Sequence, residues 1–121
     1  MKTLKRWLAA INAHDVEALA ELMAPEFVFV DALGNQVNGA SPNEAGWRSY
    51  LAMCPDYWIR TDQVMAEDDT MLLTGEAGGT IDGQSWRTPA AWKAVLRNGR
   101  LMEWRVFADN KPVYEILAKR R

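Results

Sequence analysis

Several residue types that define common classes of protein are scarce in this sequence. Its 121 residues include one cysteine, Cys54, and one histidine, His14, which excludes an internal disulfide and cannot supply the ligands of a closed zinc site. No stretch of about 18 consecutive apolar residues occurs, and the N-terminus lacks an apolar segment of secretory type. We therefore expect a cytoplasmic protein that needs no metal or other cofactor and does not enter a membrane.

The charge is also too balanced to indicate a polyanionic partner. Fourteen basic residues face sixteen acidic ones, which gives a formal net charge of −2. Binding to nucleic acid or to an anionic membrane surface usually requires a basic excess. The only basic run is Lys119-Arg120-Arg121, which we expect to be a solvated tail. The charge pattern thus predicts no nucleic-acid partner.

Apolar and aromatic residues, in contrast, are plentiful. Hydrophobic residues make up 49% of the chain, and six of its residues are tryptophan. A chain of this length and composition can fill one hydrophobic core, and no linker or internal repeat divides it. We expect a single domain spanning residues 1–121.

Helices are predicted in the first half of the chain. The first has apolar residues at helical spacing and ends near residues 12–14, after which Asp15 caps a short second helix. Ser41 is expected to cap a third helix, with Pro42 in its first turn and Glu44 closing a capping box. These signals predict three N-terminal helices.

Strands are predicted between the second and third helices and in the second half. Residues 26–31 alternate as a strand, with Phe27, Phe29 and Asp31 on one face. Further strands are expected at about residues 57–67, 70–81, 85–97 and 100–109. The pairs Asp82-Gly83 and Asn98-Gly99 favour two-residue hairpin turns, which would make the strands that they join antiparallel neighbours.

This order of elements predicts an α+β fold in which a curved antiparallel sheet wraps around the three N-terminal helices. Gly75, Gly78 and Gly79 lie inside one strand, where glycine marks a bend or a bulge. A sheet that curls around helices forms a cone. The interior of the cone is a pocket wherever side chains do not fill it.

The last predicted strand places three charges on one face of an otherwise apolar segment. Glu103, Arg105 and Asp109 share this face with Phe107. Because a solvated face does not usually need a phenylalanine, we interpret this face as the pocket wall. The alternatives are an exposed ion pair between Glu103 and Arg105, and an Asp109 that only ends the strand.

The sequence resembles a known superfamily in three segments. These are "WLAAINAHDVEALAELMAPEFVFVDALG", "PDYWIRTDQVMAEDDTMLLTGEAGGT" and "NGRLMEWRVFADN". Together with the order of elements, they resemble the nuclear transport factor 2-like superfamily, and within it the SnoaL-like polyketide cyclases and ketosteroid isomerase. The resemblance implies the cone-shaped fold. It implies less about function, because the superfamily includes isomerases, cyclases, epoxide hydrolases, dehydratases and proteins without catalysis.

The resemblance also implies candidate catalytic residues. Asp31 falls where ketosteroid isomerases carry their general-base aspartate, and Trp7 falls where they carry an oxyanion-hole tyrosine. Asp109 falls at the general-base position of the cyclases, with Arg105 before it as a positioning or charge-stabilising group. Asp31 also precedes the turn at residues 32–35, where an aspartate commonly binds backbone N–H groups instead.

Aromatic residues complete the predicted pocket and a predicted interface. The expected substrate-binding residues are Trp7, Phe27, Phe29, Trp47, Tyr50, Glu103 and Phe107. Trp92 and Trp104 alternate with the charged face, so we expect them on the outer face of the sheet, where they would join two copies into a homodimer. The sequence thus predicts a dimeric small-molecule pocket protein. One possibility is an acid–base isomerase or cyclase, or a hydratase/hydrolase-type enzyme, that acts without a cofactor on an apolar ring-bearing or carbonyl substrate. The alternative is a non-catalytic binding or structural protein of the same fold.

Overall fold

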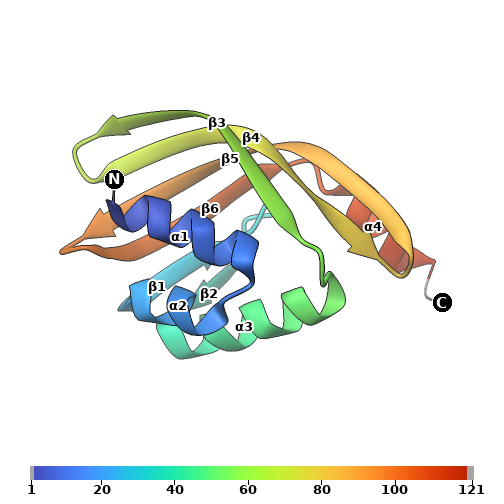
Figure 1. Cartoon of the computed structure of the whole chain (residues 1–121), viewed down its shortest axis with the longest axis horizontal. Coiled ribbons are helices and arrows are strands. Elements are labelled where there is room, and N and C mark those ends of the chain that lie inside the picture. The colour runs from blue at the N-terminus through green and yellow to red at the C-terminus, as the bar shows by residue number, and fades with distance from the viewer. Residues whose placement is uncertain (1, 120–121) are drawn as a thin grey trace.

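The chain places its helices against the concave side of a curved sheet (Figure 1). The structure is a computed structural model that describes residues 2–119, so Arg120 and Arg121 of the basic run lie outside the described residues. The helices in this range are α1 (Lys2–Ala13), α2 (Val16–Leu22), α3 (Ala40–Met53) and α4 (Lys111–Ala118). The strands are β1 (Met23–Val30), β2 (Gln36–Asn38), β3 (Trp58–Glu67), β4 (Thr70–Ile81), β5 (Gln84–Arg97) and β6 (Arg100–Ala108).

The strands form one mixed sheet in the order β2-β1-β6-β5-β4-β3. Strands β3 to β6 form an antiparallel meander, and the turns at Asp82-Gly83 and Asn98-Gly99 have positive φ at both residues, as predicted. Strand β1, however, pairs with β6 in parallel. The prediction of an entirely antiparallel sheet is therefore wrong at this pair, where the long intervening chain allows both strands to run the same way. The α+β class and the curved sheet are confirmed.

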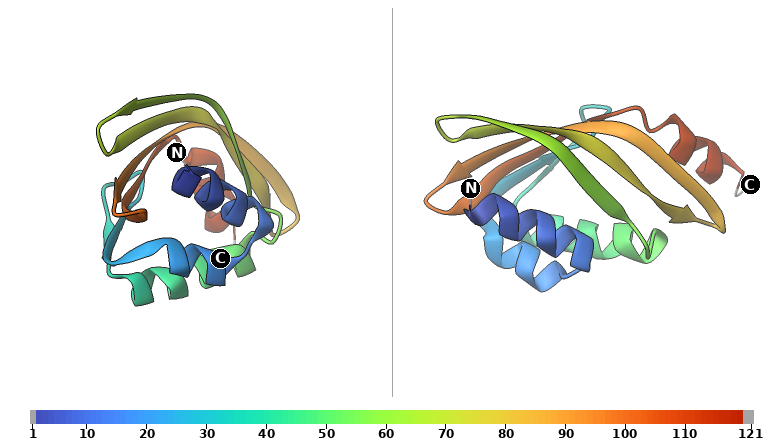
Figure 2. Two further views of the ribbon diagram at one scale, coloured as in Figure 1. Left: turned by 60° about the vertical axis from the view of Figure 1, so that its left-hand side comes forward. Right: turned by 45° about the horizontal axis from the view of Figure 1, so that its top comes forward.

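The curvature of the sheet has a local cause in the pairing of β3 with β4. The pairing with β3 shifts between Thr61, opposite Gly75, and Gln63, opposite Thr74, so Asp62 is an additional residue in β3. A β-carbon at Gly75 would collide with the carbonyl oxygen of Arg60. The predicted irregularity at the glycines is thus a β-bulge in β3 opposite Gly75, which bends the strands. Figure 2 (left) shows them curving over α1.

The junction between the first two helices forms as the sequence predicts. Residues 12–14 end α1, and His14 takes the left-handed conformation with φ of 57°. The Asp15 side chain then caps α2 by accepting a hydrogen bond of 3.1 Å from the backbone N–H of Ala18. The junction is therefore fixed by local hydrogen bonding.

Helix α3 begins differently from the prediction. Its N-cap is Gly39, with φ of 99°, so Ser41 and Glu44 form no capping box. Instead, the buried Asn43 side chain donates hydrogen bonds from Nδ2 to the carbonyl oxygens of Gly39 (2.7 Å) and Val37 (3.0 Å). This side chain ties the first turn of α3 to β2.

The C-terminal helix α4 was not predicted. Asp109 accepts a hydrogen bond of 3.0 Å from the backbone N–H of Lys111, Pro112 occupies the first turn, and Val113 and Ile116 are buried. This helix covers the end of the sheet away from the N-terminus (Figure 1). No helix within residues 2–119 is long and apolar enough to span a membrane.

The centre of the core is aromatic. The Trp7 ring lies 5.6 Å from Phe27 and 5.8 Å from Trp104, measured between ring centroids, and Trp104 stacks on Trp92 at 6.0 Å. Trp92 and Trp104 are 1% and 2% exposed, so the prediction that they lie on the outer face of the sheet is wrong. Burying two indoles inside the cone stabilises the fold more than leaving them on a solvated face.

Candidate functional site

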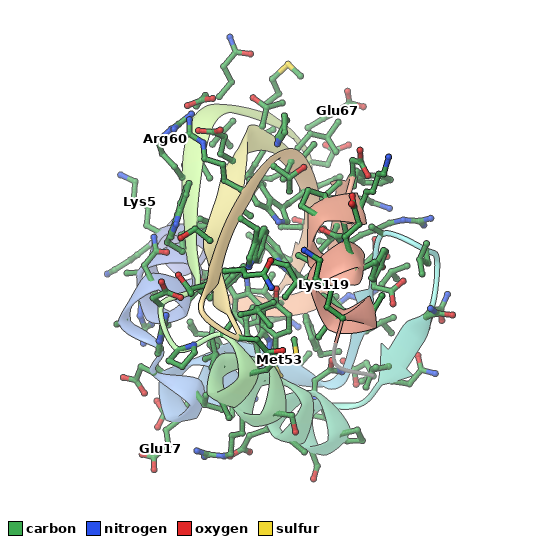
Figure 3. The ribbon with its side chains drawn as sticks, turned by 90° about the vertical axis from the view of Figure 1, so that its right-hand side faces the viewer. Lys5, Glu17, Met53, Arg60, Glu67 and Lys119 are labelled. Atoms are coloured by element: carbon green, nitrogen blue, oxygen red, sulfur yellow. The ribbon has the colours of Figure 1, made fainter. Side chains whose placement is uncertain are left out.

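The concave side of the sheet encloses a cavity of about 340 Å³, here named the inner cavity. Its walls come from β1, β4, β5, β6, α3 and α4, and Figure 3 views the molecule from the end where α4 and the last turn of α3, labelled at Met53, lie. Aromatic rings dominate the lining: Phe29, Trp47, Tyr50, Tyr57, Trp86, Trp92, Trp104 and Tyr114. A concave, mostly apolar site with a few polar groups is typical of small-molecule binding.

Two tyrosines place hydroxyl groups in this apolar surrounding. The rings of Tyr50 and Tyr57 meet edge to face with 5.1 Å between centroids, and Tyr57 stacks on Trp86 at 6.2 Å. Neither hydroxyl has a hydrogen-bond partner among residues 2–119. Burial raises the pKa of both phenols, so both stay neutral and can donate a hydrogen bond.

The position of Tyr57 is set by the junction of α1 and α2. The ring N–H at Nε2 of His14 donates to the Tyr57 carbonyl oxygen at 2.6 Å. The Asn12 side chain bonds both backbone groups of Ile59, accepting from its N–H (2.9 Å) and donating to its carbonyl oxygen (3.0 Å). Since these bonds hold the chain on both sides of residue 58, the Tyr57 ring is fixed at the cavity wall.

Asp31 is the only carboxylate that lines the inner cavity within the described part of the chain. It also builds the turn after β1. Its Oδ1 accepts from the backbone N–H groups of Leu33 and Asn35, both at 2.9 Å, and its Oδ2 accepts from the Asn35 side chain at 3.2 Å. Both interpretations of Asp31 from the sequence, pocket residue and turn residue, therefore describe its position.

The charged face of β6 points away from the cavity. Trp104, Val106 and Ala108 line the inner cavity, so strand alternation places Glu103, Arg105 and Phe107 on the outer face. The interpretation of this face as the pocket wall is wrong. The opposite face of β6 carries Trp104, and burying this larger indole stabilises the fold more than burying Phe107 would.

The outer-face residues interact with one another and with β5. Phe107 is 47% exposed, and the Arg105 guanidinium lies 5.3 Å from the centre of its ring. The Glu103 carboxylate lies 3.3 Å from the Lys93 ammonium group. Arg105 and Glu103 therefore do not contact a ligand in the inner cavity.

Of the other predicted binding residues, some line the cavity and some lie behind it. Phe29, Trp47 and Tyr50 line it. Trp7 and Phe27 are fully buried and pack behind the lining, where the Trp7 ring contacts Trp47 with 6.1 Å between centroids. These two residues therefore support the wall and do not reach the space inside.

Sequence reasoning missed polar and aromatic lining residues. Asn43 lines the cavity. Its Nδ2 donates both of its hydrogens to backbone carbonyl oxygens, whereas its Oδ1 accepts no hydrogen bond from the described residues and is available to a ligand. Tyr57 and Trp86 were also missed, since the alternation near them is too irregular to assign faces. Tyr114 was missed together with α4, although Pro112 followed by apolar residues at helical spacing was a usable signal.

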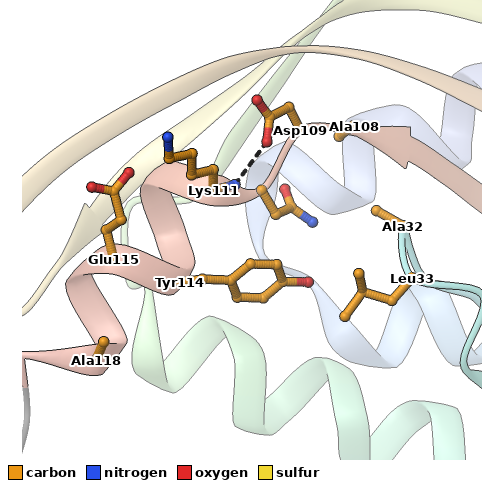
Figure 4. A pocket seen from close by; sticks show the side chains of 9 residues that line it. Ala32, Leu33, Ala108, Asp109, Lys111, Tyr114, Glu115 and Ala118 are labelled. Atoms are coloured by element: carbon orange, nitrogen blue, oxygen red, sulfur yellow. Dashed lines mark hydrogen bonds between the residues drawn. The ribbon is translucent and has the colours of Figure 1, made fainter.

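A second depression, here named the outer groove, lies beside the inner cavity and has a volume of about 360 Å³. It is lined by Ala32, Leu33, Ala108, Asp109, Asn110, Lys111, Tyr114, Glu115 and Ala118. Figure 4 shows the Tyr114 ring directed toward Leu33 across it. Asp109 thus lies at the rim of this groove, where it bonds the Lys111 N–H, and not in the inner cavity.

Metal-ligating residues do not gather in the part of the chain that the structure describes. Within residues 2–119, no group of three or more histidine, cysteine, aspartate or glutamate side chains is placed to hold a metal ion. Cys54 is buried, and its Sγ lies 3.8 Å from the Asp56 carboxylate. Burial raises the pKa of this thiol, which favours its neutral form.

Comparison with known proteins identifies the family. The sequence matches the family described as SnoaL-like domain over residues 4–104, whereas no curated protein matches it. A proposed SnoaL-like polyketide cyclase from Jannaschia sp. CCS1 superposes with a TM-score of 0.83 at 21% identity, covering 93% of this chain and 87% of that one. An LEH-like epoxide hydrolase from M. tuberculosis gives a TM-score of 0.83 at 13% identity, covering 98% and 88%.

A third similar structure is a protein from Catenulispora acidiphila DSM 44928 with a ketosteroid isomerase-like fold, in complex with trimethylamine. It gives a TM-score of 0.80 at 20% identity and covers 88% of this chain and 84% of its own. At these identities the three structures establish the fold, and the activities in their names remain theirs. The predicted recognition is confirmed: this chain belongs to the SnoaL-like domain family and has a ketosteroid isomerase-like fold.

Proposed function

We propose that this protein binds an uncharged, ring-bearing small molecule with a carbonyl oxygen in the inner cavity. One observation carries the proposal: two neutral tyrosine hydroxyls without partners among the described residues belong to a mostly apolar lining. A ligand without polar atoms would leave these donors unpaired away from bulk water, which is unfavourable. A ligand with an acceptor oxygen satisfies them.

The aromatic walls select the rest of the ligand. Trp47, Tyr50 and Tyr57 are partly exposed and present ring surface to the cavity, in front of the buried Trp92 and Trp104, which stack with 15° between their ring planes. Flat apolar rings pack well on such surfaces, through burial and through ring–ring contacts worth about 0.5–1.5 kcal/mol each. A cavity of about 340 Å³ is at the lower end of the usual range for small-molecule sites. A compound of two fused rings is therefore a suitable probe.

We further propose acid–base chemistry with Asp31 as the base. The Asp31 carboxylate would take a proton from the carbon next to the ligand carbonyl, and the electron pair of that C–H bond would move to the carbonyl oxygen, where a tyrosine hydroxyl stabilises the enolate. Returning the proton to a different carbon gives an isomerase, and attack of the enolate on a second carbonyl gives a cyclase. Within the described residues, Oδ1 accepts two hydrogen bonds and Oδ2 accepts one, from the Asn35 side chain, so Oδ2 is the oxygen available for the proton.

The second candidate function is ligand binding without catalysis. It is favoured by the hydrogen bonds that the Asp31 carboxylate accepts from Leu33 and Asn35, because these bonds by themselves account for an aspartate at this position. The two candidates share the ligand and the cavity. They differ only in whether Asp31 exchanges a proton with the ligand.

Paired probes test the binding. We would titrate the protein with 6-methoxy-2-acetylnaphthalene and with 6-methoxy-2-ethylnaphthalene, which lacks the carbonyl oxygen, and follow tryptophan fluorescence. One additional hydrogen bond of about 1 kcal/mol predicts about fivefold tighter binding of the ketone. In Tyr57→Phe and Tyr50→Phe, combined if necessary, this preference should disappear while the ethyl compound still binds. Equal affinity of the wild type for both compounds would contradict the proposal.

The chemistry needs its own measurement. Proton abstraction from the acetyl methyl group in heavy water replaces its hydrogens by deuterium, which proton NMR detects as loss of the methyl signal. If Asp31 is a base, the wild type should accelerate this exchange and Asp31→Asn should not, although the variant still binds the ketone. Saturable binding without accelerated exchange would leave a binding protein as the function.

A further inference from the structure

The inner cavity and the outer groove are neighbouring parts of one space. Four residues line both: Ala32, Ala108, Asn110 and Tyr114. A residue that contacts two volumes forms the wall between them, so a single layer of side chains separates these two. Their volumes, about 340 and 360 Å³, are nearly equal. The groove is therefore large enough to hold a substantial part of a ligand.

Hydrogen bonds fix only one side of the wall between the inner cavity and the outer groove. The turn that carries Leu33 is fixed, because the Leu33 N–H donates to Asp31 at 2.9 Å. Opposite it, the side chains of Tyr114 and Asn110 make no hydrogen bond with any residue from 2 to 119, and Tyr114 is 42% exposed. Partly exposed side chains without partners change rotamer quickly. Rotation of the Tyr114 ring away from Leu33 would open a passage (Figure 4).

We propose that the outer groove is a second subsite for the same ligand, which holds an uncharged aliphatic chain leaving the inner cavity between Tyr114 and Leu33. This inference rests on the proposed function. The floor of the groove is apolar, formed by Ala32, Leu33, Ala108 and Ala118. Its lining suits methylene groups, which gain free energy in proportion to the apolar surface that they remove from water.

The charges at the groove disfavour an ionised chain. Asp109 already accepts the Lys111 N–H, and the ends of Asp109, Lys111 and Glu115 lie away from the gap between Tyr114 and Leu33 in Figure 4. A carboxylate or ammonium group among the alanines would lose its hydration without meeting a partner there. A neutral chain fits, with any polar end in the solvent at the rim.

A second pair of probes tests this inference with the ring system held constant. We would compare 6-hexyloxy-2-acetylnaphthalene with 6-methoxy-2-acetylnaphthalene, which differ only in the length of the chain opposite the ketone. For the wild type we expect the hexyloxy compound to bind about tenfold more tightly, since its additional methylenes are partly buried in the groove. Ala118→Trp fills the groove, and the ratio of the two affinities should fall to about one.

Two further variants make the result specific. Ala52 is exposed on α3 and lines neither volume, so Ala52→Trp is a matched control that should keep the tenfold ratio. Leu33→Asp places a charge beside the chain, and because Leu33 is 68% exposed, this change does not endanger folding. It should lower the ratio as Ala118→Trp does.

The outcomes separate the inference from the proposed function. If the wild type binds both ketones equally, or if Ala118→Trp and Leu33→Asp keep the tenfold ratio, the groove is not a subsite while the inner cavity stands. If neither ketone binds, the proposed function fails and the inference fails with it. A tenfold ratio that both groove variants abolish and Ala52→Trp keeps supports the second subsite.

Discussion

Replacement of Asp31 separates its part in the turn from any part in chemistry. In Asp31→Ala, the N–H groups of Leu33 and Asn35, both 2.9 Å from Oδ1, lose their acceptor, as does the Asn35 side chain at 3.2 Å. An aspartate that caps a backbone in this way contributes about 0.5–2 kcal/mol, and the turn is exposed enough for water to replace part of the loss. We therefore expect the free energy of unfolding to fall by about 1–2 kcal/mol.

Asp31→Asn should behave differently. An asparagine oxygen can accept both backbone N–H groups, so only the weaker contact with the Asn35 side chain is lost. We expect a loss below about 0.5 kcal/mol. This variant would then be folded and would still lack the carboxylate, which makes it suitable for the proton-exchange experiment.

Urea unfolding followed by circular dichroism measures both effects. The matched control is Asp69→Ala, which removes an exposed carboxylate that accepts no hydrogen bond from the described residues. For a domain of this size, 1 kcal/mol corresponds to about 3–5 °C in Tm, which gives an independent check. The reasoning is refuted if Asp31→Ala is no less stable than Asp69→Ala, or if Asp31→Asn loses as much stability as Asp31→Ala.

Three other predictions concern the two faces of the sheet and one buried phenol. We propose that the homodimer expected from the sequence forms through the outer face of the sheet, where Phe107 is 47% exposed. Phe107→Glu should then sediment as a folded monomer, and an intact dimer would contradict this proposal. Trp104→Ala, in contrast, should lower the free energy of unfolding by about 3–5 kcal/mol, because it removes an indole that is 2% exposed. Burial raises the pKa of Tyr57 above its usual 10.0, so the folded state holds the phenol proton more tightly than the unfolded state does. The free energy of unfolding should therefore fall as pH rises above about 10, by up to about 1.4 kcal/mol per pH unit. Tyr57→Phe should flatten this dependence in urea unfolding, and an unchanged slope would exclude Tyr57 as its source.

The sequence predicted the features of the fold that depend on neighbouring residues. Asp15 caps α2 through its own side chain, and Asp82-Gly83 and Asn98-Gly99 form the hairpin turns, because these conformations are determined within a few residues. The start of α3 was predicted less well. A contact between Asn43 and the carbonyl of Val37 in β2 replaced the expected local capping box.

The candidate site depends on long-range packing, which alternation alone does not determine. Alternation correctly grouped Glu103, Arg105 and Phe107 on one face of β6, but it could not tell which face is concave. That choice depends on Trp104, which packs against Trp7 from α1 and Trp92 from β5. Register shifts such as the one between Val95 and Leu96 make such assignments still harder from sequence.

The most direct test of the central claim is the infrared carbonyl stretch of 6-methoxy-2-acetylnaphthalene bound to the protein. If the ketone accepts hydrogen bonds from Tyr50 and Tyr57 in the inner cavity, the stretch should lie at lower frequency than in hexane. It should return toward the hexane value when both tyrosines are replaced by phenylalanine. A bound ketone whose frequency matches hexane in the wild type, or is unchanged in the double variant, would contradict the account.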